Sequence, residues 1–245
     1  MIDAIKLSVA ETETDVDREA ALRVSRQVLL KPDSLIGLAT GDTTVGMYHW
    51  MVRLHKELAI DYSGVKTCNL DEYVGVAESD KSSCRYRIHK DLLSHINIKP
   101  ENTYVPNGLC EPPEQELQTF RETVERFGGV DLQIVGVGSN GHIAFNEPGT
   151  PFNSTYHIVP IAQSTIEAKS KMFGGRDKVP THGISMGIRD IMSSRKILLI
   201  AKGAHKAPII EKIINGDICM DVPASVLMLH PDVEIVIDRS AASLL

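Results

Sequence analysis

The sequence predicts a single α/β domain in which helices cover both faces of a mostly parallel sheet. Short apolar runs alternate with segments of helical periodicity along the whole chain, as helical crossovers between parallel strands require. Several apolar runs end in glycine, small polar or charged residues, the composition expected where strands meet a ligand-binding edge. The 245 residues show no internal repeat, low-complexity tract or linker, so we expect one domain over residues 1–245.

The chain begins with an expected strand at 4–10 and an expected helix at 15–30. Four apolar residues recur near the helical period between Val16 and Val28, and a Lys-Pro-Asp sequence then ends the helix. The next apolar run, at 35–39, has the length of a buried strand.

A turn of small residues, TGDTT at 40–44, leads from that strand into a helix whose apolar face runs from Met47 to Leu58. A strand, a small-residue turn and a helix in succession point backbone N–H groups at an anion. The spacing of a Walker phosphate loop is absent, and an ordinary turn with a Thr cap is the alternative. We favour contact of this turn with a phosphate or a sugar.

Two adjacent carboxylates, Asp71 and Glu72, follow the next expected strand, at 65–70. Repulsion and partial burial would raise the pKa of at least one of them, which suits a general base. For this pair alone, a helix-capping Asp beside an exposed Glu is the better interpretation. Helices are then expected at 83–96, with its basic residues facing solvent, and at 112–127.

The stretch DLQIVGVGSNGHIAFNEPG, at 131–149, combines a buried strand with a glycine-rich turn. Its glycines allow the backbone to turn sharply and to approach a ligand. Asn140, His142 and Glu147 on this turn can orient or move protons. A glycine-rich strand end with a structural His is the alternative, and the pattern alone favours neither.

The last third of the chain repeats the alternation, with expected strands at 157–162, 196–201 and 233–237 and expected helices at 164–173 and 207–214. The first of these helices carries Lys169 and Lys171 and runs into two glycines, which resembles a mobile lid around 160–180. An ordinary surface helix is the alternative. Lys206 lies at a strand end beside a helix N-terminus, a natural place for a phosphate ligand.

Carboxyl ends of parallel strands lie along one edge of a sheet, so polar groups from several strands can meet there. We therefore expect one cleft lined by residues 40–44, 71–72, 140–147 and 206. This convergence, more than any single motif, favours a functional site.

Composition limits the classes of partner. The formal charge of −6 argues against nucleic acid as the main partner, although a few local cations can still bind a phosphorylated small molecule. The four cysteines are scattered, which predicts neither a zinc site nor disulfides and fits a reducing compartment. No signal peptide or membrane-spanning run is recognisable, so we expect a cytoplasmic protein without membrane contact.

Two motifs, LDEYVG at 70–75 and GVGSNGHIAFNEP at 136–148, together resemble the glucosamine-6-phosphate deaminases. The resemblance extends over nearly the whole chain, including GISMGI at 183–188 and the turn at 203–206. It implies a single Rossmann-like domain that converts glucosamine 6-phosphate and water to fructose 6-phosphate and ammonium. That reaction belongs to N-acetylglucosamine catabolism and uses neither a metal nor an organic cofactor.

The resemblance also implies roles for individual residues. Asp71 would take the proton from C2 of the open-chain sugar and return it at C1, while His142 would open the ring. Glu147 would orient and charge His142, and Asn140, where many members carry Asp, could only hydrogen-bond and orient. The implied substrate contacts are Thr40, Gly41, Asp42, Thr43, Glu72, Gly138, Lys171 and Lys206.

Two further departures from the family concern phosphate binding. Asp42 stands where the familiar turn has Gly, and its carboxylate would repel a phosphate, so we expect it to point away. Lys171 replaces the usual Arg, exchanging a bidentate contact for a point charge.

The family's hexameric members bind an allosteric N-acetylated sugar phosphate through basic residues soon after the Glu-Pro motif. Here that region reads NSTYHIVP, without Arg or Lys, and the chain stops shortly after Asp238. The resemblance therefore implies the short, non-allosteric type, as a monomer or small homo-oligomer.

Two rival functions share this fold. The 6-phosphogluconolactonases have a similar glycine turn, but LDEYVG and Glu147 favour the deaminases. Sugar-phosphate sensors of transcription regulators carry a helix-turn-helix segment ahead of the domain, for which we see no room. The sequence leaves open whether the substrate is the glucosamine or the galactosamine epimer.

Overall fold

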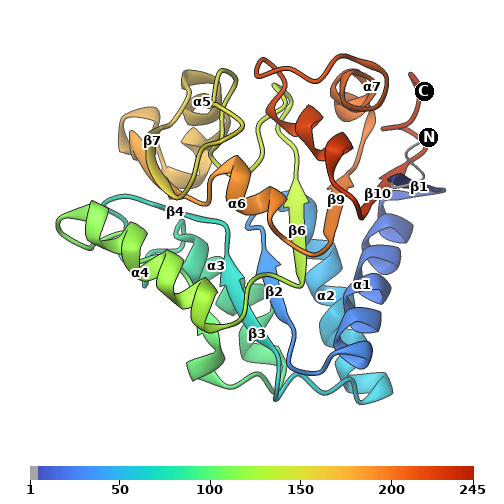
Figure 1. Cartoon of the computed structure of the whole chain (residues 1–245), viewed down its shortest axis with the longest axis horizontal. Coiled ribbons are helices and arrows are strands. Elements are labelled where there is room, and N and C mark those ends of the chain that lie inside the picture. Colours follow the sequence, from blue (N-terminus) through green and yellow to red (C-terminus); the bar gives the residue numbers. More distant parts are fainter. Residues whose placement is uncertain (1–4) are drawn as a thin grey trace.

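The computed structural model describes residues 5–245 and is built around a seven-stranded parallel sheet, which confirms the predicted fold class (Figure 1). The spatial order of its strands is β1-β10-β9-β6-β2-β3-β5. These strands are β1 (Ile5–Ala10), β2 (Leu35–Leu38), β3 (Lys66–Asn69), β5 (Thr103–Tyr104), β6 (Leu132–Gly136), β9 (Ile197–Ala201) and β10 (Val233–Asp238). Ala4, expected in the first strand, lies outside the described residues.

Helices connect these strands. The α-helices are α1 (Glu13–Leu30), α2 (Asp42–Leu58), α3 (Cys84–Asp91), α4 (Pro113–Arg126), α5 (Gln163–Phe173), α6 (Ile188–Met192) and α7 (Ala207–Asn215). Short 3-10 helices are η1 (Leu93–His95), η2 (Pro100–Asn102), η3 (Arg176–Lys178), η4 (Ala204–Lys206) and η5 (Pro223–Leu229).

Helix ends follow local capping chemistry. The first helix begins earlier than expected, because the Thr12 side chain accepts a hydrogen bond from the backbone N–H of Asp15 and caps the helix at Glu13. The expected helix at 83–96 is shorter, because Leu92 leaves the helical conformation with φ −140° and only η1 continues it.

Alternate side chains of the strands enter two separate cores. In β9, Leu198 and Ile200 join the core formed with α1 and α2, whereas Ile197 and Leu199 join the core formed with α4 and α7. Figure 1 shows the sheet passing through the middle, with α1 and α2 on one side and α4 and α6 on the other. Burial on both faces explains why these strands read as continuous apolar runs.

A second, antiparallel sheet was not predicted. It consists of β4 (Asp71–Tyr73), β8 (His182–Ser185) and β7 (His157–Pro160), in the order β4-β8-β7. Because β4 follows β3 almost directly, Asp71 lies just beyond the carboxyl edge of the large sheet. The expected strand at 157–162 thus exists, but it belongs to this small sheet.

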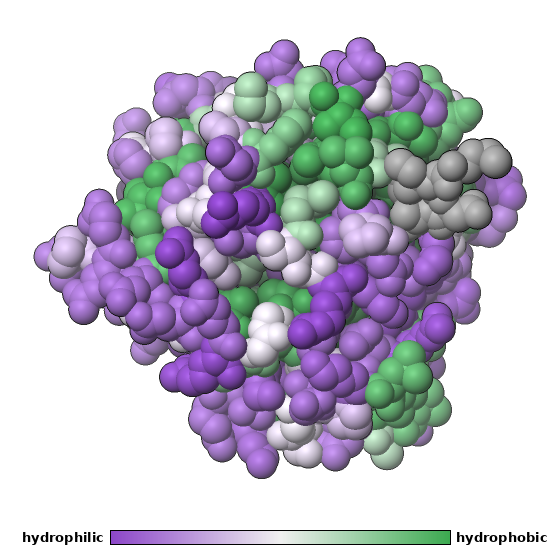
Figure 2. All heavy atoms as spheres, viewed as in Figure 1, coloured by the Kyte–Doolittle hydropathy of each residue, from purple (hydrophilic) through white to green (hydrophobic). Residues whose placement is uncertain are grey.

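Polar side chains cover most of the face shown in Figure 2, and apolar side chains gather there in separate patches. Exposed leucines include Leu29, Leu30 and Leu58, at the carboxyl ends of α1 and α2. Scattered apolar residues of this kind are common on globular surfaces. Within residues 5–245, no helix combines the length and the apolar character needed to cross a bilayer.

Candidate active site

A cavity of about 410 Å³ opens at the carboxyl edge of the large sheet. Its walls come from the strand ends at which the sequence predicted a cleft. These are the turn after β2, Asp71, the turn after β6 and the segment after β9. Among the predicted site residues, its lining includes Thr40, Gly41, Asp42, Thr43, Asp71, Gly138, Asn140, His142 and Lys206. The expected single cleft is therefore present.

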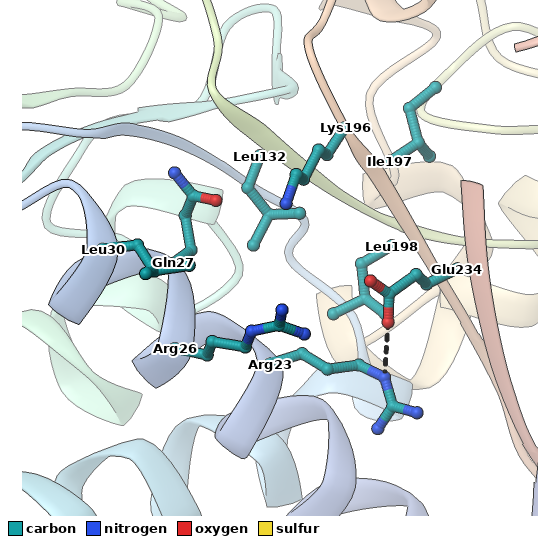
Figure 3. Close-up of a pocket in the computed structure, with 9 residues that line it drawn as sticks. All are labelled: Arg23, Arg26, Gln27, Leu30, Leu132, Lys196, Ile197, Leu198 and Glu234. Carbon is teal, nitrogen blue, oxygen red and sulfur yellow. Dashed lines mark hydrogen bonds and ion pairs between the residues drawn. The ribbon is translucent and has the colours of Figure 1, made fainter. Parts of the chain in front are cut away.

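A second cavity, of about 20 Å³, lies at the opposite edge of the sheet (Figure 3). Arg23, Arg26 and Lys196 surround it, and Arg23 is already paired with Glu234 at 2.9 Å. This volume accommodates about one water molecule, which excludes a sugar phosphate.

The turn after β2 presents backbone N–H groups to the large cavity. The hydroxyl of Thr44 donates to the carbonyls of Ala39 and Gly41, at 3.0 and 3.1 Å, and so fixes the turn from inside. Thr40 Oγ1 accepts a hydrogen bond of 2.7 Å from Asn69. The N–H of Thr44 donates to the carbonyl of Gly41 at 3.3 Å, and the N–H groups of Asp42 and Thr43, the first two residues of α2, can donate to an anion.

Asp42 belongs to the cavity lining, but its carboxylate is open to solvent and paired with an arginine. Its side chain is 90% exposed and pairs with Arg87 Nη2 at 2.8 Å. This ion pair partly neutralises the carboxylate, which weakens its repulsion of a phosphate at the positive end of α2.

Asp71 is partly exposed at the cavity wall, and the pKa of its carboxyl is raised to about 7. Burial contributes most to this increase and the neighbouring Glu72 adds to it, whereas Cys84 and Lys169 oppose it. A carboxylate with this pKa can accept and return a proton near neutrality, which is what a general base requires.

Glu72 does not reach the cavity, which corrects the expectation of a substrate contact. It is 2% exposed, and its carboxylate accepts hydrogen bonds from the backbone N–H groups of Tyr73, Cys84 and Arg85, at 2.9, 3.0 and 3.0 Å. Glu72 thus ties the first turn of α3 to β4. Glu72 is therefore the capping group and Asp71 faces the cavity. This is the reverse of a helix-capping Asp beside an exposed Glu, the interpretation favoured for the pair alone.

The turn after β6 is closed by its own backbone, with Gly138 N–H donating to the carbonyl of His142 at 2.9 Å. A Cβ atom at position 138 would lie 2.3 Å from His142 Cε1, so only glycine fits beneath the imidazole ring. Gly141 has φ +89°, the left-handed region that favours glycine. Both glycines are therefore needed to hold His142 in place.

Glu147 lies behind His142 and outside the cavity lining. Its Oε2 is 3.2 Å from His142 Nδ1, without the alignment of a hydrogen bond, and it accepts a hydrogen bond of 2.8 Å from Asn140 Nδ2. Oε1 accepts a hydrogen bond of 2.7 Å from Thr165 on α5. Burial alone would raise the pKa of Glu147, but His142, Thr165 and Asn140 together lower it to about 2. Glu147 is thus a fixed anion that can stabilise a protonated His142.

Two lysines face the cavity. Lys206 donates a hydrogen bond of 2.8 Å to the carbonyl of Val137, and burial, aided by the charge of Lys169, lowers its pKa. Lys169 also lines the cavity, whereas Lys171 is exposed and does not. Residues two apart on a helix point in different directions, so Lys169 takes the place that was expected for Lys171.

Sequence reasoning missed Lys169, Thr165 and Cys84 as cavity residues. Thr165 and Lys169 are four positions apart on α5 and thus share one helix face, a signal that was available in the sequence once one residue of that face was fixed. Cys84 lies thirteen residues beyond Asp71, and nothing in its sequence context indicates contact with that carboxylate.

Comparison with known proteins places this geometry in context. Residues 10–236 match the family model described as glucosamine-6-phosphate isomerases/6-phosphogluconolactonase. A glucosamine-6-phosphate deaminase of Clostridium botulinum (strain Kyoto / Type A2) is 43% identical over 239 residues, covering 98% of both chains. That of Halothermothrix orenii is 43% identical over 241 residues, covering 98% of this chain and 100% of its own.

Solved structures give the same picture. A monomeric glucosamine-6-phosphate deaminase superposes with a TM-score of 0.96 at 39% identity, covering 98% of this chain and 100% of its own. The 6-phosphogluconolactonase of Trypanosoma brucei gives a TM-score of 0.78 at 16% identity, with both chains fully covered. At that identity, the second likeness shows a shared fold only.

Proposed function

Since the chain belongs to the family of glucosamine-6-phosphate isomerases and 6-phosphogluconolactonases, we propose that it is a glucosamine-6-phosphate deaminase. It isomerises and deaminates glucosamine 6-phosphate with water, giving fructose 6-phosphate and ammonium. The observation that carries the proposal is a basic carboxylate, Asp71, in the same cavity as His142, which has the Glu147 carboxylate behind it. The reaction needs two such groups, one for ring opening and one for proton transfer between carbons.

Ring opening is assigned to His142. An imidazole with a fixed anion behind it can pass a proton to the ring oxygen and take one from the C1 hydroxyl. Asn140 holds the anion and, through its Oδ1, accepts a hydrogen bond of 3.2 Å from the backbone N–H of His142. An amide cannot relay a proton, so Asn140 orients this group and does no more.

Proton transfer between carbons is assigned to Asp71. The carboxylate removes the proton from C2 of the open-chain aldehyde while a proton of the C2 ammonium group passes to the aldehyde oxygen, which gives an enolamine. The carboxyl then returns its proton at C1. The product carries an imine at C2, water adds to this carbon, and ammonium leaves as the ketone forms. The two carbons are adjacent, so one partly exposed carboxylate can serve both of them.

The phosphate is assigned to the turn at 40–44 together with Lys206 and Lys169. These groups combine N–H groups of a helix N-terminus with two ammonium groups. Burial is the main cause of the lowered pKa of Lys206, and the charge of Lys169 adds to it, so the two cations repel each other. A bound dianion would relieve that repulsion, which favours phosphorylated over unphosphorylated sugars.

Lactone hydrolysis is the rival activity within the family. It needs one base to activate water and no carboxylate that reaches two carbons. The deaminases named above are 43% identical over 98% of this chain, whereas the lactonase of Trypanosoma brucei shares only its fold at 16% identity. Both comparisons favour the deaminase.

The direct test supplies the purified protein with glucosamine 6-phosphate, galactosamine 6-phosphate and 6-phosphogluconolactone in parallel. We expect ammonium and fructose 6-phosphate in equal amounts from the first. Acid release from the lactone above the spontaneous rate, with no ammonium from either amino sugar, would contradict the proposal. The galactosamine arm decides which epimer is used.

We also propose that the protein is a cytoplasmic monomer or small homo-oligomer. The similar solved deaminase is monomeric and superposes over nearly the whole chain. Light scattering at assay concentration measures the oligomeric state.

A further inference from the structure

The carboxylate of Asp71 receives one hydrogen bond from the described part of the chain, residues 5–245, and its donor is a thiol. Cys84 Sγ lies 3.6 Å from Asp71 Oδ1, a normal length for a sulfur donor. Cys84 is 4% exposed and belongs to the lining of the large cavity. A thiol inside the candidate active site, in contact with its base, is not accounted for by the roles assigned above.

The position of this thiol is fixed by the backbone around it. Cys84 is the first residue of α3, and the Ser83 side chain caps that helix by accepting from Tyr86 N–H. Glu72, next to Asp71 on β4, accepts the backbone N–H of Cys84 at 3.0 Å. The buried carboxylate of Glu72 therefore ties the backbone that carries the thiol to the strand that carries Asp71, which holds the two groups close together.

Sulfur gives this contact a particular chemical character. A thiol is a weak donor, and burial, with the nearby carboxylates, raises the pKa of Cys84 well above its usual value, so it remains a neutral S–H group. A hydroxyl or amide in its place would stabilise the charged carboxylate more strongly and make it a weaker base.

We propose that Cys84 is a positioning residue for the deamination reaction, whose thiol orients the carboxylate of Asp71 toward the sugar while leaving it basic. This inference rests on the proposed function. It assigns no covalent step to the sulfur, because a buried neutral thiol is a poor nucleophile.

Other titratable groups also face Asp71 and must be considered in any pH experiment. Glu72 and Tyr73 belong to its own strand, Lys169 comes from α5 and Tyr48 comes from α2. Burial raises the pKa of both tyrosines, so they stay neutral where the carboxyl titrates. Glu72 and Lys169 are left unchanged by a substitution at Cys84, so a shift between variants reports on the thiol.

The test compares the pH dependence of kcat/KM in the parent, C84A and C84S. Loss of the donor in C84A should move the acidic midpoint to higher pH, which lowers kcat/KM about two- to fivefold at a pH below the midpoint. The stronger hydroxyl donor in C84S should move the midpoint the other way. Cys68→Ala is the matched control, because Cys68 is also a buried thiol but does not line the cavity. Its midpoint should equal that of the parent.

Coincident midpoints in the parent, C84A and C84S would overturn the proposal, since a residue that only fills space does not change a titration. The infrared spectrum of the parent provides a test that needs no turnover. The S–H stretching band that disappears in C84A should move to lower frequency as Asp71 ionises near pH 7. A band that ignores this titration would also refute the hydrogen bond. If ammonium release fails while the band shifts, the proposed function is wrong and the contact stands.

Discussion

Asp71 must remain ionisable in a partly buried position, and its surroundings favour the neutral form. Burial and Glu72 raise its pKa to about 7, so the charged, catalytically competent carboxylate predominates only above neutrality. We expect kcat/KM to fall about tenfold per pH unit below that value and to level off above it. Asp71→Asn should remove this acidic limb and lower turnover by ~10²–10⁴-fold or more, with substrate binding largely kept. Steady-state kinetics across the pH range measure both effects, and turnover within tenfold of the parent would place the base elsewhere.

The raised pKa of Asp71 also makes the stability of the folded protein depend on pH. A carboxyl whose pKa is higher in the folded than in the unfolded protein favours folding below the unfolded value of 3.8, and this contribution is lost as the pH rises through about 7. Asp71→Asn lacks that titration. The variant should therefore gain thermal stability relative to the parent between pH 5 and pH 8, as active-site substitutions often do. Melting curves of the parent and the variant at pH 5 and pH 8 test this. If the difference in Tm between the two proteins is the same at both pH values, Asp71 titrates normally.

Single residues show where sequence reasoning succeeds and where it stops. Asp71, His142 and Lys206 could be located because each lies within six residues of the end of a strand of the parallel sheet, and strand ends converge. Glu72 could not be separated from Asp71, because the choice depends on two backbone N–H groups of α3, which lie 12 and 13 positions after Glu72 in the chain. Cys84 was missed for the same reason.

Helix α5 contacts Glu147, the large cavity and strand β4. Its Thr165 donates to Glu147, its Lys169 lines the cavity, and its carboxyl end packs through Phe173 against Tyr73, with ring centroids 5.1 Å apart. A helix with these contacts can couple the binding of a phosphate at Lys169 to the position of the His142–Glu147 pair. We propose that it acts as the lid expected around residues 160–180.

This arrangement predicts different effects for the two lysines of α5. Lys169→Ala should raise the KM for glucosamine 6-phosphate about ten- to a hundredfold, because a charged hydrogen bond to phosphate contributes roughly 1.5–3 kcal/mol. Lys171→Ala is the matched control on the same helix and should stay within about twofold of the parent, as exposed substitutions usually do. A larger effect at Lys171 than at Lys169 would contradict the assignment and indicate that α5 turns when substrate binds.

Among elements, the long periodic helices and the buried strands of the large sheet could be predicted, since burial on both faces leaves continuous apolar runs. The small sheet could not. Its strands span three or four residues each, and the partner of Asp71 in this sheet is Ser185, more than a hundred positions away. No local sequence pattern indicates such a strand pairing.

At the scale of the whole molecule, the segment that the sequence resemblance equates with an allosteric site forms β7 of the small sheet. His157 Nε2 contacts Asn146 Oδ1 at 3.1 Å, burial lowers the pKa of its imidazole, and Val159 is buried. A neutral imidazole and a buried valine offer no charge to a phosphate, and allostery requires a second site whose ligand distinguishes two states.

We therefore expect hyperbolic kinetics that N-acetylglucosamine 6-phosphate does not activate. Rates measured against substrate concentration, with and without this compound, test the expectation. A sigmoidal curve that the compound makes hyperbolic would show that a regulatory site exists elsewhere on the molecule.

The most direct test of the proposed function follows the one proton that Asp71 transfers. Glucosamine 6-phosphate is converted in deuterated water by the parent and by Asp71→Asn, and the product is examined by NMR while ammonium is measured. We predict ammonium and fructose 6-phosphate in equal amounts, with solvent deuterium at C1 of the product in the parent, because the ionised carboxylate exchanges its proton. We predict neither product from the variant. Ammonium release by the variant at the parent's rate, or a parent that releases none, would contradict the account.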